Sequence, residues 1–145
     1  MALKAYGFEF VGYRSGRKEP IYRQYLFKDG ETLTKGDPLN LESGEVDLYA
    51  TGGDAGFIGI ADETKTGVDS TTYIRVIYDN DGDAMYRVTD ANARSEGAEL
   101  DITGTTGAMT LGADGDSDVI VVVNSTATEP TIVRSHPRAR GFTAS

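Results

Sequence analysis

The stretch "GETLTKGDPLNLESGEVDLYA", residues 30–50, alternates short apolar groups with turn-forming residues. Leu39 and Leu41 stand two positions apart, and so do Val46 and Leu48. Successive side chains of a β-strand point to opposite faces of the sheet, so a spacing of two is typical of a strand with one buried face. The stretch therefore predicts two short strands joined by a turn.

The corner "KGDP" before the first of these strands raises the question of whether it is a binding loop. Gly36 tolerates a positive φ, which a tight corner needs. Pro38 cannot donate a ladder hydrogen bond, so it suits the first residue of a strand. We therefore interpret Gly36, Asp37 and Pro38 as scaffold rather than as a site.

The same two-residue period recurs along most of the chain, and glycines separate the apolar groups. The predicted strands, besides the two in residues 39–50, are at 5–13, 21–27, 57–61, 72–78, 84–88, 98–103, 108–111 and 118–123, and 131–134 is a candidate for one more. A helical stripe is hard to find; "DANARSEG" (90–97) predicts one or two helical turns, with Asp90 as N-cap and Gly97 as C-cap signal. The sequence thus predicts an all-β barrel or sandwich of about eight to ten short strands.

The bulk composition limits the classes of protein that fit. The chain has 145 residues, enough for one domain with a real core, and it contains no cysteine. Disulfides, thiolate metal sites and a cysteine nucleophile are therefore excluded. No segment has the ~20 apolar residues that cross a bilayer, and the first residues lack a secretory signal. We expect a soluble protein made in a cytoplasm, with no membrane partner.

The net charge of −9 is unevenly distributed. Residues 1–28 carry +4, residues 131–145 carry +3, and residues 29–130 carry −16. The acidic body argues against nucleic acid as a direct partner, because phosphates and carboxylates repel. The two basic ends either contact something acidic on a partner or fold back onto the acidic body.

The chain offers little that points to catalysis or to a bound cofactor. Asp79, Asp81 and Asp83 have the spacing of a calcium loop, but Ala84 stands where such a loop needs glycine, and strands rather than helices are predicted on either side. We favour a β-hairpin turn there. The single histidine, His136, lies in a basic segment without a predictable partner. We predict no enzyme, no cofactor and no metal site.

Aromatic residues concentrate at the N-terminal end, beside positive charge. Tyrosine and arginine dominate protein–protein contacts, and an extended segment can add a strand to the sheet edge of a partner. The N-terminal segment therefore predicts a partner-binding arm; alternatively, Phe8, Phe10 and Tyr25 fill the core of this protein itself. The residues expected in the arm's contact are Tyr6, Phe8, Phe10, Tyr13, Arg14, Arg17 and Lys18.

The order of motifs resembles the head decoration, or cement, proteins of tailed bacteriophages, the family that includes the phage lambda head decoration protein. The resemblance lies in "GETLTKGDPLNLESGEVDLYATGG", "GFIGIADETKTG", "YIRVIYDNDGDAMYRVTDAN" and "GAELDITGTTGAMTL", and it covers about residues 28–124. It implies a β-tulip domain over 29–130, with 1–28 as a basic aromatic arm and 131–145 as a basic tail outside it.

The resemblance also implies a function and partners. Members of this family bind the expanded head as trimers at threefold sites, contact the major capsid protein, and stabilise the shell against DNA pressure. The protein would then lie on the outer surface of the virion, with the arm reaching the capsid. No catalytic residues come with the family. The alternative is a virion-borne or extracellular carbohydrate-binding β-domain that stacks surface tyrosines on sugars.

Overall fold

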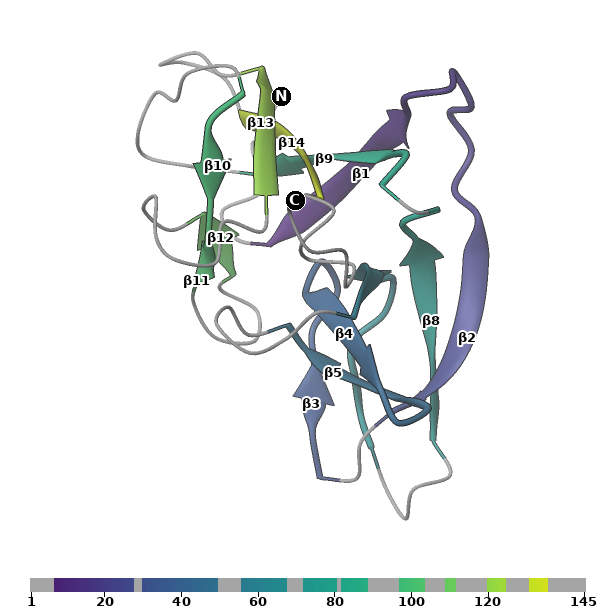
Figure 1. Ribbon diagram of the computed structural model, residues 1–145. Helices are drawn as coiled ribbons and strands as arrows, with labels where there is room; N and C mark the ends of the chain where they lie inside the picture. The colour runs from purple at the N-terminus through teal and green to yellow at the C-terminus, as the bar shows by residue number, and fades with distance from the viewer. Residues whose placement is uncertain are drawn as a thin grey trace.

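The computed structural model confirms an all-β protein with a small barrel (Figure 1). It describes residues 7–27, 30–49, 56–67, 72–80, 82–88, 97–103, 109–111, 120–124 and 131–135. Fourteen strands and no helix lie within these ranges. The described part accordingly contains no helix of the length and apolarity that crossing a bilayer requires.

Five strands close into a barrel. In the order around the barrel they are β2 (Tyr22–Phe27), β5 (Glu45–Leu48), β4 (Pro38–Glu42), β6 (Phe57–Ala61) and β8 (Tyr73–Tyr78). The pair β2–β5 is parallel, and the other four pairs are antiparallel. Closure leaves none of these strands with an open edge, which protects short strands from unwanted pairing.

Five further strands form an open antiparallel sheet beside the barrel (Figure 1). Their order is β1 (Phe8–Tyr13), β9 (Ala84–Val88), β14 (Thr131–Ser135), β13 (Ile120–Asn124) and β10 (Glu99–Leu100). Two small ribbons complete the described fold: β3 (Thr32–Leu33) with β7 (Lys65–Thr66), and β11 (Ile102–Thr103) with β12 (Thr110–Leu111). Every assigned strand therefore has at least one hydrogen-bonded neighbour.

The stretch at 30–50 folds as its spacing predicts. Strands β4 and β5 form a hairpin in which Leu39 pairs with Leu48 and Leu41 with Val46. The two-residue turn between them has positive φ at Ser43 and Gly44, the type I′ geometry that matches strand twist. The corner before β4 has the geometry that the sequence predicts: Gly36 has a φ of 94°, and the buried Asp37 accepts a hydrogen bond from the Thr34 amide at 2.8 Å.

The protein has two hydrophobic cores that share the wall of the barrel. The barrel interior holds Phe27, Leu33, Leu39, Val46, Ala61, Ile74 and Val76. The second core lies between the barrel and the five-stranded sheet, where Ile60 and Ile77 pack with the aromatic rings of Phe8, Phe57 and Tyr86. Strands β6 and β8 thus bury side chains on both faces, which explains why "FIGIA" and "VI" in their sequences are continuously apolar.

The structure corrects the predicted hairpin at residues 79–83. Strand β8 pairs with β2 and β6 in the barrel, whereas β9 pairs with β1 and β14 in the open sheet. The segment is a tight turn, with the Ala84 amide donating to the Asp79 carbonyl at 3.1 Å, but it leads from one sheet to the other. The turn residues determine where the chain bends. Which strands pair with β8 and β9 is determined by the packing of the barrel and the open sheet.

A buried polar network fixes this connection between barrel and sheet. The Asp79 carboxylate is 1% exposed and accepts hydrogen bonds from the Tyr86 hydroxyl at 2.5 Å, the Gly82 amide at 2.8 Å and the Ser135 hydroxyl at 3.0 Å. Burial and the Asp79 charge raise the pKa of Tyr86 well above its usual range, so its hydroxyl keeps the proton that it donates. One carboxylate thereby joins the end of β8, its turn, β9 and β14.

The boundaries predicted at residues 28 and 131 do not separate structural units. Strand β1 pairs with β9 along its whole length, and β2 closes the barrel against β8 and β5. Strand β14 lies between β9 and β13 inside the open sheet. The described parts of both predicted basic ends therefore belong to the folded domain, because their alternating apolar residues face its cores.

Candidate docking surface

The residues predicted for a partner-binding arm divide between the core and the surface. Phe8 is fully buried and meets the Tyr86 ring edge-on at 6.2 Å. Tyr13 is 3% exposed, and its hydroxyl donates to the Tyr78 carbonyl at 2.8 Å and accepts from the Ile21 amide at 3.0 Å. Phe10 is half-buried against Tyr13, with ring centroids 4.8 Å apart. The arm interpretation is therefore wrong for Phe8 and Tyr13, which belong to the protein's own core, whereas Phe10 is partly buried against that core.

The cations of the predicted arm do lie on the surface. Arg14, Arg17 and Lys18 are exposed in the turn between β1 and β2, and we call residues 14–18 the basic loop. The Tyr13 amide donates to the Arg17 carbonyl at 2.7 Å, so the loop is closed by backbone contacts. The Ser15 hydroxyl donates a hydrogen bond to Asp83 Oδ2 at 2.7 Å, which attaches the loop to the rest of the protein. The loop thus presents its charges from a defined backbone.

The largest exposed aromatic side chains lie elsewhere, on the outer face of β2 and β8. Tyr22 and Tyr73 are each 53% exposed, and they are the exposed large hydrophobic residues of the described part. In the antiparallel register Gln24 pairs with Arg75, which lies between the two tyrosines, and the Arg75 guanidinium carbon is 5.5 Å from the Tyr22 ring centroid. We call Tyr22, Gln24, Tyr73 and Arg75 the tyrosine face.

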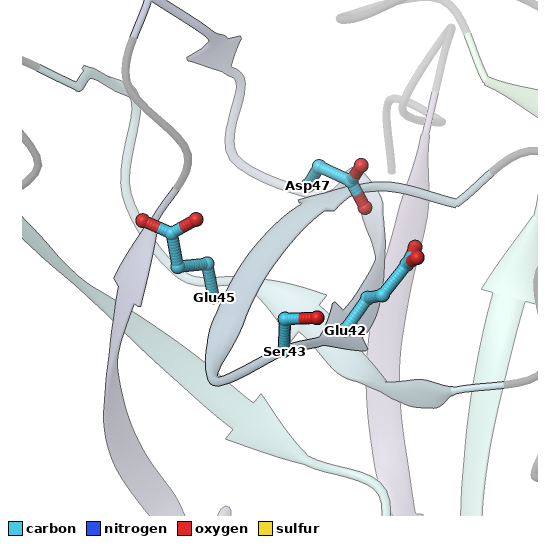
Figure 2. Close-up of a pocket in the computed structure, with 4 residues that line it drawn as sticks. All are labelled: Glu42, Ser43, Glu45 and Asp47. Atoms are coloured by element: carbon cyan, nitrogen blue, oxygen red, sulfur yellow. The ribbon is translucent and has the colours of Figure 1, made fainter.

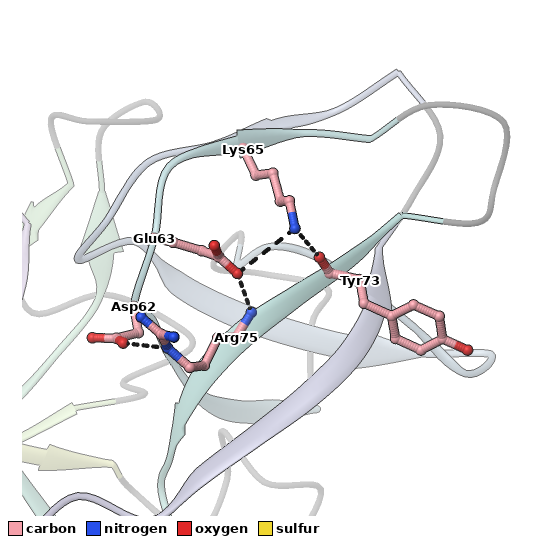
Figure 3. Close-up of polar contacts among 5 residues, drawn as sticks. All are labelled: Asp62, Glu63, Lys65, Tyr73 and Arg75. Atoms are coloured by element: carbon pink, nitrogen blue, oxygen red, sulfur yellow. Dashed lines mark hydrogen bonds and ion pairs between the residues drawn. The ribbon is translucent and has the colours of Figure 1, made fainter.

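Polar contacts from residues 62–65, the loop after β6 and the start of β7, hold this face in place (Figure 3). Arg75 donates from Nε to Asp62 at 2.6 Å, and its backbone amide donates to Glu63 at 2.8 Å. Lys65 donates to the Tyr73 carbonyl at 2.9 Å. The hydrogen bond and the charge of Asp62 raise the pKa of Arg75 above its usual range, so the guanidinium stays charged. A partner would therefore meet an already ordered surface.

Sequence reasoning placed these residues on strands but did not single them out as an exposed aromatic surface. The alternation in residues 72–78 separates Tyr73, Arg75 and Ile77 from Ile74 and Val76, and the structure buries the second set inside the barrel. What the period does not reveal is that Ile77, on the outer face, is covered by the open sheet while Tyr73 is not. The sequence feature that could have indicated this surface is the presence of Tyr22, Tyr73 and Arg75 on the polar sides of two predicted strands.

A second charged surface surrounds the turn of the β4–β5 hairpin (Figure 2). A hollow of about 190 Å³ is lined by Glu42, Ser43, Glu45 and Asp47, which we call the acidic hairpin tip. Glu42 and Glu45 are cross-strand partners, so two like charges stand opposite each other. Such a pair is unfavourable in an isolated chain.

Asp79 and Asp83, two of the aspartates considered for calcium, accept hydrogen bonds from other residues of the protein. The Asp79 oxygens accept the three hydrogen bonds of the buried network, and both Asp83 oxygens accept hydrogen bonds from Ser15. Asp81 lies outside the described residues. Within the described ranges, no group of three metal-ligating side chains is brought together.

Four further features of the sequence fall on residues that the structure does not describe. These are Tyr6 of the predicted arm, residues 90–96 of the one or two helical turns predicted from Asp90, the single histidine His136, and the basic end of the chain after Ser135. Their predictions stand as made from the sequence.

Neither a family model, nor a curated protein, nor a solved structure matches this chain.

Proposed function

We propose that this protein is a head decoration protein of a tailed bacteriophage. It binds the outer surface of the expanded shell, contacts the major capsid protein as a homotrimer at threefold sites, and stabilises the shell against DNA pressure. The proposal rests on the order of motifs in residues 28–124 and on an ordered binding surface. It assigns no catalytic residue, cofactor or nucleic-acid contact.

The observation that carries the proposal is the tyrosine face. A pair of half-exposed tyrosines beside an arginine has the composition of protein–protein hot spots, in which few residues supply most of the binding energy. The rings are carried by paired strands of a closed barrel, so little backbone conformational entropy is lost when they are covered. Asp62 accepts a hydrogen bond from the Arg75 guanidinium, and Glu63 accepts one from the Arg75 backbone amide.

The physical action of a cement follows from linkage. A protein that binds the assembled shell, and not the separated subunits, stabilises the shell by its own binding free energy. Each contact is small but is repeated at every site. The net charge of −9 limits clumping of unbound copies in solution.

Co-sedimentation with empty expanded heads of the parent phage tests the proposal. We expect saturable binding of the full chain, and we expect Tyr22→Ala with Tyr73→Ala to raise the dissociation constant at least about tenfold, because truncating a hot-spot side chain costs about 1–3 kcal/mol. Point variants are preferred to truncation, since β1 and β2 belong to the folded domain.

Two control variants sharpen that experiment. Tyr22→Phe with Tyr73→Phe keeps both rings and is expected to retain most of the affinity. Glu99→Ala, on the far edge of the open sheet, is expected to bind as wild type. Absence of saturable binding by the wild-type chain contradicts the proposed function, and equal loss in all variants contradicts the assignment to the tyrosine face.

The same exposed rings favour a second candidate, a carbohydrate-binding β-domain, because tyrosine faces stack on the apolar faces of sugars. A glycan array separates the two candidates. A specific glycan signal that disappears in Tyr22→Ala, together with no binding to heads, supports the alternative. A negative array with saturable head binding supports the decoration protein.

A further inference from the structure

We infer that copies of this chain associate head to tail, with the basic loop of one copy against the acidic hairpin tip of the next. The inference deepens the proposed homotrimer by naming the contact between copies, and it rests on the proposed function in that respect alone. The contact itself is derived from two oppositely charged surfaces that the fold places at the two ends of one strand.

Strand β2 separates these surfaces. The basic loop leads into β2 before Tyr22, whereas Glu45 of the hairpin pairs with Leu26 near the other end of the strand (Figure 1). Four residue steps of a strand span roughly 13 Å. The cations of the loop are therefore too far from the hairpin carboxylates for direct ion pairs within one chain, and a second copy brings them together.

Both surfaces carry charges that the described part of the chain leaves without an ion-pair partner. Ion pairs in the described part join Lys65 with Glu63, Arg75 with Asp62, and Arg87 with Glu9. None of them uses a residue of the basic loop or of the acidic hairpin tip. The loop carries three positive charges, and the hairpin tip carries three negative charges around its hollow.

The backbone of each surface is ordered, which favours a specific contact over diffuse attraction. Ser15 ties the loop to Asp83, and the type I′ turn at Ser43 and Gly44 fixes the hairpin. The two surfaces are different patches, so their contact is heterologous and continues from copy to copy until the rotation closes a ring. It uses none of the four side chains of the tyrosine face, which stay available to the shell.

Sedimentation velocity on the full chain, without heads, tests the contact by charge reversal. We expect wild-type protein to associate at 50 mM salt and to dissociate at 1 M salt, where the Debye length falls to about 3 Å. Arg17→Glu with Lys18→Glu, and Glu42→Lys with Glu45→Lys, are each expected to shift the association at least about tenfold toward monomer, because each places like charges across the contact.

The variant that carries all four reversals is the decisive member of the set. It exchanges the signs of both surfaces and keeps the wild-type net charge, and we expect it to recover salt-sensitive association. Glu99→Lys with Asp101→Lys changes the net charge as the hairpin variant does, but on and beside strand β10 at the edge of the open sheet, and it is expected to associate as wild type.

Two results overturn the inference. One is a wild-type chain that stays monomeric at low salt and millimolar concentration. The other is a four-reversal variant that stays monomeric while wild type associates. Neither result bears on binding to heads, which is measured separately, so failure of this contact and failure of the proposed function are distinguishable.

Discussion

Asp79→Ala is expected to lower the free energy of unfolding by about 4 kcal/mol, because removing one member of a buried, hydrogen-bonded network strands its partners. The substitution leaves the Tyr86 hydroxyl, the Ser135 hydroxyl and the Gly82 amide without their common acceptor. Because these donors come from β9, β14 and the turn, the loss weakens the junction between barrel and sheet. Urea unfolding followed by circular dichroism measures the change.

A double-mutant cycle shows whether the loss comes from the network. Tyr86→Phe alone is expected to cost about 1–3 kcal/mol, and the double variant is expected to cost at least about 1 kcal/mol less than the sum, since one stranded donor is gone. A loss below about 1 kcal/mol for Asp79→Ala, or strict additivity, contradicts the role given to this carboxylate.

Gly59→Ala is expected to lower the free energy of unfolding by at least about 4 kcal/mol. A loss of this size is exceptional for a point substitution and indicates a steric conflict in the fold. Gly59 lies in β6 with a φ of 145°, and a Cβ there would stand 2.0 Å from the Ile77 carbonyl oxygen. The obstacle is backbone of the neighbouring strand, so the barrel has to open at the β6–β8 pair to admit a methyl group. Thermal and urea unfolding measure the effect.

Gly97→Ala is the matched control for that substitution. Gly97 also has a positive φ, 83°, but no heavy atom lies within 4 Å of its Cβ position. Backbone strain alone is then expected to cost about 1–2 kcal/mol. Equal losses at Gly59 and Gly97 would show that close packing of β6 on β8 does not decide barrel closure.

The sequence predicts the longer strands well, misses the two-residue strands β3 and β7, and predicts strand partners poorly. The two-residue period predicts β4, β5, β6, β8 and β9 to within about two residues, because apolar and polar residues alternate within each segment. The partners of β8 and β9 depend on contacts far along the chain, such as Ser135 to Asp79. A turn rich in aspartate and glycine is compatible with a hairpin and with a passage between sheets.

The sequence predicts the residue types of the candidate surface, tyrosine and arginine, but not which tyrosines and arginines are exposed. Tyrosine beside arginine was expected to mark the binding residues, and the described structure presents that combination at Tyr22, Tyr73 and Arg75 rather than at Phe8 and Tyr13. Both sets lie on strands with alternating residues. Only the packing of the open sheet on the barrel decides which aromatic side chains are covered.

Hydroxyl-radical footprinting of the protein free and bound to expanded heads tests the central claim most directly. The account predicts that Tyr22 and Tyr73, each 53% exposed in the free chain, lose most of their reactivity on the shell, while the buried Tyr49 and Tyr86 stay unreactive in both states. Saturable binding that leaves Tyr22 and Tyr73 as reactive as in solution would contradict the claim that the tyrosine face docks on the capsid.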